Sequence, residues 1–231
     1  MPEYTLRYSK KAKYLQLRLS IHGLEVVIPA NTLISPLIIE QFIQQKQPWI
    51  ERKKERCSFQ AKNALQLPTS IHLQAIEQSW EVIYLATPQQ RLKLNANACK
   101  QLKLVGHTSN QTLCIRLLKQ WLKSMAQQHL TKELLLISEK TGLGFKGITI
   151  RNTKTRWGSC SSQQKINLCC KLLFLPPILM RHVLLHELCH TKFMHHGKAF
   201  WDLLERFDSS AKIHARQLKL AVRDIPLWAN G

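Results

Sequence analysis

The chain has 231 residues, of which 45% are hydrophobic, and 34 Lys and Arg outweigh 14 Asp and Glu to give a net charge of +20. It contains no run of about 18 apolar residues, and its seven Cys form neither a regular framework nor a C-x-x-C pair, which excludes a membrane span and a disulfide scaffold. The opening residues Met1–Tyr14 are polar and basic rather than an apolar export signal, so we expect a cytoplasmic protein that does not engage a membrane.

The first half of the chain is predicted to be rich in strands. Residues 4–29 alternate between apolar and polar side chains and turn at His22-Gly23, and residues 35–57 predict a helix. Residues 65–105 then predict several short strands, and the polar run that begins at Gly106 predicts a boundary. We therefore expect a basic, strand-rich region with one helix over residues 1–105 and a second domain over residues 106–231.

The second half is predicted to mix helices and strands. Residues 113–141 have the pattern of a long amphipathic helix that stops at Gly142. Apolar residues alternate around Ile148–Ile150 and again around Ile166–Leu168, which predicts two antiparallel strands joined around residues 158–165. Two more helical segments follow, so the chain as a whole predicts an α+β fold.

One of these helical segments contains His186-Glu187-Leu188-Cys189-His190, which reads H-E-x-x-H. Residues four apart lie one turn apart on a helix, so both imidazoles project from one face and can bind a single ion. Glu187 is next to the first histidine, a position that suits a carboxylate that deprotonates a metal-bound water without ligating the metal. The motif therefore predicts a Zn²⁺ cofactor, with Glu187 as the general base.

A catalytic zinc site typically has three protein ligands, so a third donor is expected nearby. The candidates are His195 and His196. We favour His196, because ten positions after His186 leave room for the chain to turn back, and Gly197 eases that turn. An apolar helical face over residues 200–207 would anchor the returning segment.

Two other known classes of zinc site fit less well. Metzincins carry Gly where the helix must break, and this chain has Phe193 there. A glutamate ligand of the thermolysin type would have to be Glu205, which falls inside the second apolar face. Cys160 and Cys189 are discounted as ligands, because Cys189 points away from the histidine face and small thiols are ordinary core residues.

Four motifs follow one another along the second half: Arg156-Trp157-Gly158-Ser159-Cys160-Ser161, Ile166-Asn167-Leu168, His186-Glu187-Leu188-Cys189-His190 and His196-Gly197-Lys198-Ala199-Phe200-Trp201. With Arg7–Lys13 and Pro48-Trp49-Ile50 near the start, they resemble the YgjP-like metallopeptidase family, a distant relative of SprT-like and WLM proteases. The resemblance implies a zincin-like catalytic domain in which His186, His190 and His196 bind zinc and Glu187 is the general base.

The chain departs from the family pattern at Cys169-Cys170, where the family usually has another polar residue, so the role of this position is left open. The segment from about Ala211 onward lies outside the motifs, and we expect it to cover part of the catalytic domain. Arg156 is a candidate substrate-binding residue, because a peptide could pair with the edge of a strand beside the active-site helix. The alternative is a structural cation packed on Trp157.

The function favoured by these observations is a zinc-dependent peptidase that acts on peptides or proteins. A metal-dependent nucleotide or phosphoanhydride hydrolase is an alternative, although the sequence contains no phosphate loop. A second alternative is a SprT-like protease or binding module associated with nucleic acid, in which a closed four-ligand zinc would be structural. The large basic excess predicts at least weak association with nucleic acid.

Overall fold

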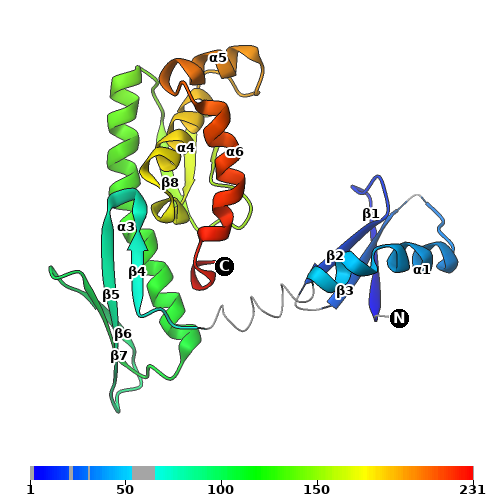
Figure 1. Cartoon of the computed structure of the whole chain (residues 1–231), viewed down its shortest axis with the longest axis horizontal. Coiled ribbons are helices and arrows are strands. Elements are labelled where there is room, and N and C mark those ends of the chain that lie inside the picture. The colour runs from blue at the N-terminus through cyan, green and yellow to red at the C-terminus, as the bar shows by residue number, and fades with distance from the viewer. Residues whose placement is uncertain (1–2, 21–22, 31, 54–65, 231) are drawn as a thin grey trace. The chain divides into compact units, whose positions relative to one another are not determined.

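The computed structural model describes residues 3–20, 23–30, 32–53 and 66–230, and these form an α+β protein with three small mixed sheets (Figure 1). The chain divides into two compact units, Met1–Asn63 and Ala64–Gly231. Among the described residues, no helix is both long enough and apolar enough to cross a bilayer.

The first unit is a small sheet with a helix. Its sheet has the order β1-β3-β2, with β1 (Tyr4–Ser9) parallel and β2 (Gln16–Ser20) antiparallel to β3 (Gly23–Pro29). Alternate residues of β3 pack on α1 (Pro36–Gln45) and on Ile50 in a core of their own. This core consists of Leu24, Val26, Ile28, Ile39, Ile43 and Ile50.

The predicted strands of this unit are present, and the predicted helix is divided in two. The expected turn at His22 lies outside the described residues, and Gly23 begins β3 with a φ of 114°, which a residue with a side chain rarely adopts. Helix α1 ends at Gln45, and the backbone is helical again over residues 47–53. The remainder of the predicted helix, residues 54–57, lies outside the described part.

The second unit begins with the predicted run of short strands. These are β4 (Ser70–Leu73), β5 (Gln78–Ala86), β6 (Lys93–Ala96) and β7 (Gln101–Gly106), and they form one sheet in the order β4-β5-β7-β6. Strands β5 and β7 are parallel, and the two outer pairs are antiparallel. The four strands share one core with the remainder of the unit.

The long helix predicted over residues 113–141 is α3 (Gln111–Thr141). Asn110 caps its first turn by accepting a hydrogen bond from the Leu113 amide, and Gly142 ends it with a φ of 69°. Its buried residues recur every three or four positions, from Cys114 to Ile137. Figure 1 shows α3 running the length of the unit, beside the four-stranded sheet and then beside the elements that carry the site.

The expected boundary near residue 105 therefore falls inside the second unit. Leu102 and Leu104 of β7 are fully buried in the same hydrophobic core as Leu118 and Leu122 of α3. The polar run from Gly106 is a short loop that connects β7 to α3. The division observed between the two compact units lies instead at residues 63 and 64.

The third sheet corrects the expected strand pairing. Strands β8 (Gly147–Arg151) and β10 (Lys165–Cys169) are neighbours, as expected, but they run parallel. The hairpin is formed instead by β10 and a short third strand, β9 (Gly158–Cys160), which is antiparallel to it and lies at the other edge. Alternation of apolar residues identifies strands but not their direction. Here residues 152–157 cross from β8 to β9, and β8 and β10 therefore run parallel.

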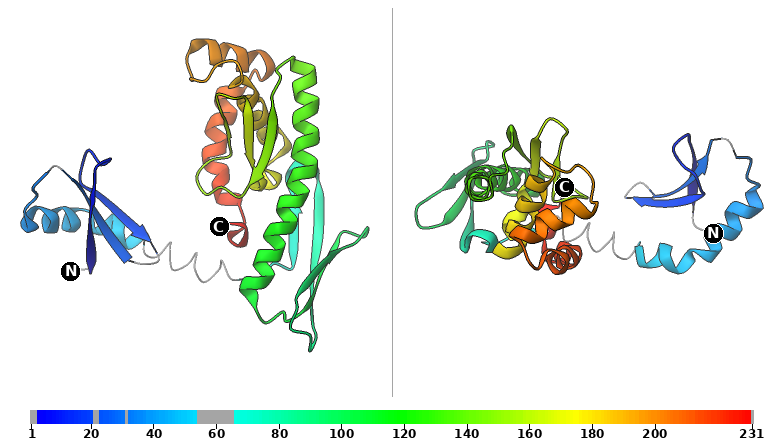
Figure 2. Two further views of the ribbon diagram at one scale, coloured as in Figure 1. Left: turned by 180° about the vertical axis from the view of Figure 1, so that it is seen from behind. Right: turned by 90° about the horizontal axis from the view of Figure 1, so that it is seen from above.

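Three helices complete the unit: α4 (Pro177–Cys189), α5 (Lys198–Phe207) and α6 (Ala211–Ala221). Both α5 and α6 contact α4, and the two views of Figure 2 show α6 lying alongside it. The segment after Ala211 thus covers one side of the helix that carries the H-E-x-x-H motif. Cys169 and Cys170 are buried at the end of β10, where the Cys169 thiol donates to the Thr153 carbonyl.

Candidate metal centre

Helix α4 supplies His186, and His190 is the residue that caps the C-terminus of this helix. The helix begins behind Pro176 and is buried over most of its surface, so the H-E-x-x-H motif lies in a helix held firmly by the core. The chain leaves the helix after His190, and Gly197 then starts α5. This path returns His196 to His186 and leaves the exposed His195 outside the cluster.

The three imidazoles of His186, His190 and His196 converge through their Nε2 atoms. The Nε2 of His186 lies 3.1 Å from that of His190 and 3.0 Å from that of His196. A neutral imidazole carries one N–H, so hydrogen bonds cannot satisfy three nitrogens that face a common point. Nitrogens bound at about 2.0–2.1 Å to a tetrahedral ion lie a little more than 3 Å apart, so the cluster fits a metal.

The surroundings of His186 and His190 favour the neutral imidazole and orient the ring of His190. Burial, with the neighbouring imidazoles of His190 and His196, lowers the pKa of His186 to about 3. The Nδ1 of His190 lies 3.0 Å from the Phe193 carbonyl, which fixes its proton there and leaves Nε2 free as a ligand. Both features suit metal binding, since a protonated imidazole cannot ligate.

Phe200 packs against all three rings of the cluster. The centroid of its ring lies 5.0 Å from that of His186, 4.6 Å from that of His190 and 4.7 Å from that of His196. The residue is fully buried in the first turns of α5. This aromatic anchor holds the returning segment in place, so His196 is fixed by packing, although it is itself exposed.

Glu187 lies beside the cluster and is almost completely buried, with 4% of the residue exposed. Within the described part of the chain its Oε2 atom has no hydrogen-bond partner. Burial raises the pKa of Glu187 to about 8, against the opposing charge of Arg156. A buried carboxylate oxygen left without a donor is costly, and a neighbouring cation would offset that cost.

Gly158 allows β9 to pass directly over this carboxylate. A Cβ atom at position 158 would lie 2.5 Å from Oε1 of Glu187, closer than real contacts allow. Glycine is therefore required at position 158, because the strand backbone there lies too close to the Glu187 side chain for a Cβ atom to fit. The exposed Arg156 precedes it and forms no ion pair among the described residues, but its charge acts on Glu187.

A cavity of about 500 Å³ opens beside His186 and Glu187. Its lining includes Thr155, Trp157 and Gly158, and also residues of α6 together with Val222, which follows that helix. Pockets that bind small ligands commonly enclose about 300–1,000 Å³. The candidate centre thus faces a space large enough for part of a substrate.

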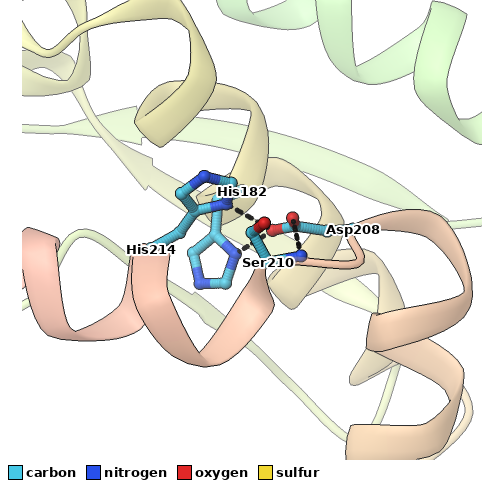
Figure 3. Close-up of polar contacts among 4 residues, drawn as sticks. All are labelled: His182, Asp208, Ser210 and His214. Carbon is cyan, nitrogen blue, oxygen red and sulfur yellow. Dashed lines mark hydrogen bonds and ion pairs between the residues drawn. The ribbon is translucent and has the colours of Figure 1, made fainter.

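Sequence reasoning missed a second cluster on α4, made by His182, Asp208 and His214 (Figure 3). Oδ2 of Asp208 lies 2.6 Å from Nδ1 of His182 and 2.9 Å from Nδ1 of His214. The Ser210 amide donates to the other carboxylate oxygen. His182 is one turn before His186, so the spacing H-x-x-x-H-E-x-x-H could have indicated it.

Hydrogen bonds account for this second cluster without a cation. One carboxylate oxygen can accept from both N–H groups, so each polar atom in the contact has a partner of opposite character. Burial alone would raise the pKa of Asp208, but the two imidazoles outweigh it and lower the pKa. The carboxylate therefore ties α4 to α6, since His182 belongs to one helix and His214 to the other.

A comparison with models of known protein families identifies the family of this chain. The model of the YgjP-like metallopeptidase domain matches residues 13–221, which is most of the chain. The chain belongs to the YgjP-like metallopeptidase family. No curated protein and no solved structure matches the sequence. Family membership and the histidine cluster together indicate a metal-dependent peptidase with a peptide or protein substrate.

Proposed function

We propose that this YgjP-like protein is a zinc-dependent peptidase with a zincin-like catalytic centre. The ligands in this proposal are His186, His190 and His196, and Glu187 is the general base. The observation that carries it is the convergence of three Nε2 atoms next to a buried carboxylate whose Oε2 has no donor in the described part of the chain. Three histidine ligands leave a fourth position for chemistry, which is typical of catalytic zinc.

Zinc held by these ligands would supply a Lewis acid that polarises the scissile carbonyl and makes water acidic enough to lose a proton. Glu187 would accept that proton, because its buried carboxylate lies beside the cluster and its Oε2 has no hydrogen-bond donor in the described part of the chain. The same carboxyl would then deliver the proton to the leaving amine. The backbone of Gly158 keeps water away from one side of the carboxylate.

The peptide would bind along β9. This strand is at the edge of its sheet, so its outer backbone groups can pair with an extended peptide without regard to sequence. Arg156, two residues before the first residue of the strand, would steady the developing oxyanion or a substrate carboxylate. Its exposed position and its effect on Glu187 support this role.

The test of the proposed function compares two adjacent histidines. We expect His196→Ala to lose both bound zinc, measured by atomic spectroscopy, and cleavage of an unfolded protein, measured by mass spectrometry. His195→Ala is the matched control, and it should retain both, because His195 lies outside the cluster. Zinc retained by His196→Ala, or cleavage of nucleoside triphosphates in place of peptides by the zinc-loaded protein, would contradict the proposal.

Association with nucleic acid remains a prediction that rests on charge. The excess of 34 Lys and Arg over 14 Asp and Glu favours polyanions through counterion release. Such binding would weaken steeply as salt is raised, which a filter-binding titration can measure. Affinity that is independent of salt would contradict the electrostatic explanation. The cytoplasmic location also remains a prediction.

A further inference from the structure

The cavity beside the candidate metal centre has a mixed lining. It includes His186 and Glu187, the residues that would face the reacting bond, and also His182. Apolar side chains of α4, of α6 and of the residue after α6 also line it, namely Val183, Leu218 and Val222. An apolar group bound against these side chains would therefore lie next to the bond being cleaved.

The α6 wall of the cavity is held in place by the second histidine cluster. His214 is next to Ala215, which lines the cavity, and its ring is tied through Asp208 to His182 on α4. The wall and the helix of the proposed zinc ligands are thus linked by partly buried side-chain hydrogen bonds. A cavity fixed in this way exists before a ligand arrives, which favours selection by size and shape.

We infer that this cavity is the specificity pocket of the enzyme and that it binds a large aliphatic side chain, such as that of Leu, from the substrate residue next to the scissile bond. The inference rests on the proposed peptidase function. Side chains of an extended peptide alternate between the two faces, so a peptide paired with β9 would direct every second side chain toward α4 and α6.

The size of the cavity supports this occupant. An apolar cavity of roughly 150 Å³ holds a benzene molecule. The observed volume of about 500 Å³ therefore has room for one large side chain and the backbone that carries it. Lys219 is the cationic lysine of the lining and stands on the exposed side of α6, so Lys or Arg at this substrate position is disfavoured by like charge.

The experiment maps cleavage sites in a peptide library with the zinc-loaded protein. We expect Leu to be preferred over Ala at one position next to the cleaved bond by at least about tenfold in kcat/KM, since differences of one or more methylenes are worth that much. Ala215→Leu fills the pocket and should shift the preference toward small residues. Leu218→Ala enlarges it and should admit Phe and Trp.

Leu220→Ala is the matched control for Leu218→Ala. It removes the same side chain from the same helix, at a residue that is 60% exposed and outside the cavity lining. We expect its preference to equal that of the unmodified protein. Opposite shifts in Ala215→Leu and Leu218→Ala cannot come from a general loss of stability, so together they would establish the pocket.

A second measurement does not depend on turnover. Glu187→Gln protein should bind a Leu-containing peptide more tightly than the same peptide with Ala at that position, as measured by calorimetry, and Ala215→Leu in that background should remove the difference. Cleavage without an aliphatic preference, or with a preference that neither pocket variant changes, would overturn this inference and leave the peptidase proposal intact. No cleavage of any peptide by zinc-loaded protein would overturn both.

Discussion

The two histidine clusters on α4 are one helical turn apart, yet they differ in what holds them together. In one, the three Nε2 atoms of His186, His190 and His196 face one another at 3.0 and 3.1 Å. In the other, two Nδ1 atoms face the carboxylate of Asp208 at 2.6 and 2.9 Å. Both clusters bring histidine rings to similar distances from a polar neighbour, and the balance of donors and acceptors distinguishes them.

This difference indicates which cluster requires a cation. Acceptors that converge without donors are unfavourable unless a positive charge lies among them, whereas donors that converge on an anion are already satisfied. The acidic residue at each cluster shows the same difference in available hydrogen-bond donors. Glu187 lacks a donor for Oε2 in the described structure and its pKa is raised, whereas Asp208 has two imidazole donors and its pKa is lowered.

The largest effect is expected from Glu187→Gln. The amide cannot accept a proton, so cleavage of an unfolded protein should fall by about 10²–10⁴-fold, the usual contribution of a general base. Bound zinc should remain, because Glu187 is outside the ligand set. Turnover and metal content measured on one sample check this. Full activity in the variant would show that the carboxylate near the first cluster has another role.

Asp208→Asn should mainly affect stability. The change removes the charge that two imidazole donors share, and hydrogen bonds to charged groups are each worth about 1.5–3 kcal/mol. We expect the free energy of unfolding to fall by about 2–4 kcal/mol in denaturant titrations, with one zinc still bound per chain. If the variant lost a metal ion instead, the second cluster would be a metal site and the comparison would fail.

How far the sequence predicts these features depends on how local the signal is. H-E-x-x-H follows from helix periodicity alone, and the long helix α3 follows from its period and from Gly142. The second cluster was missed because Asp208 and His214 are distant in sequence from His182 and carry no motif. The direction of β8 was also missed, since a crossover at residues 152–157 is not visible in alternation.

Stabilisation by zinc should distinguish the two clusters. A ligand that binds only the folded state stabilises it by about 2.7 kcal/mol at a concentration 100 times its Kd. We start from the metal-free forms of the unmodified protein and of His214→Ala. When zinc is added, we expect the stability of both to rise by this amount, as measured by thermal unfolding. His196→Ala should gain far less. An equal loss of the zinc effect in His214→Ala and His196→Ala would mean that both clusters bind the ion.

The pH dependence of stability in metal-free protein tests the same comparison, because the two acids should act on it with opposite signs. The pKa of Glu187 is about 8 in the folded protein, whereas a solvent-exposed Glu carboxyl has a pKa of 4.5. Unfolding therefore releases a proton between these values, and the free energy of unfolding should fall as pH rises, by at most about 1.4 kcal/mol per pH unit. Asp208 has a lowered pKa when folded, so its contribution is present above the unfolded value of 3.8 and is lost in more acidic solution.

The contribution of each acid is obtained by subtracting the unfolding free energy of its variant from that of the unmodified protein. The lowered pKa of His186 is common to the unmodified protein and Glu187→Gln, so their difference in unfolding free energy reports Glu187 alone. This difference should change steadily between pH 5 and 8, while the corresponding difference for Asp208→Asn should shrink below pH 4. Urea titrations across the range measure both. A level difference for Glu187→Gln would mean that its carboxylate is already paired without metal, and the contrast between one cluster that needs a cation and one that does not would then lose its electrostatic basis.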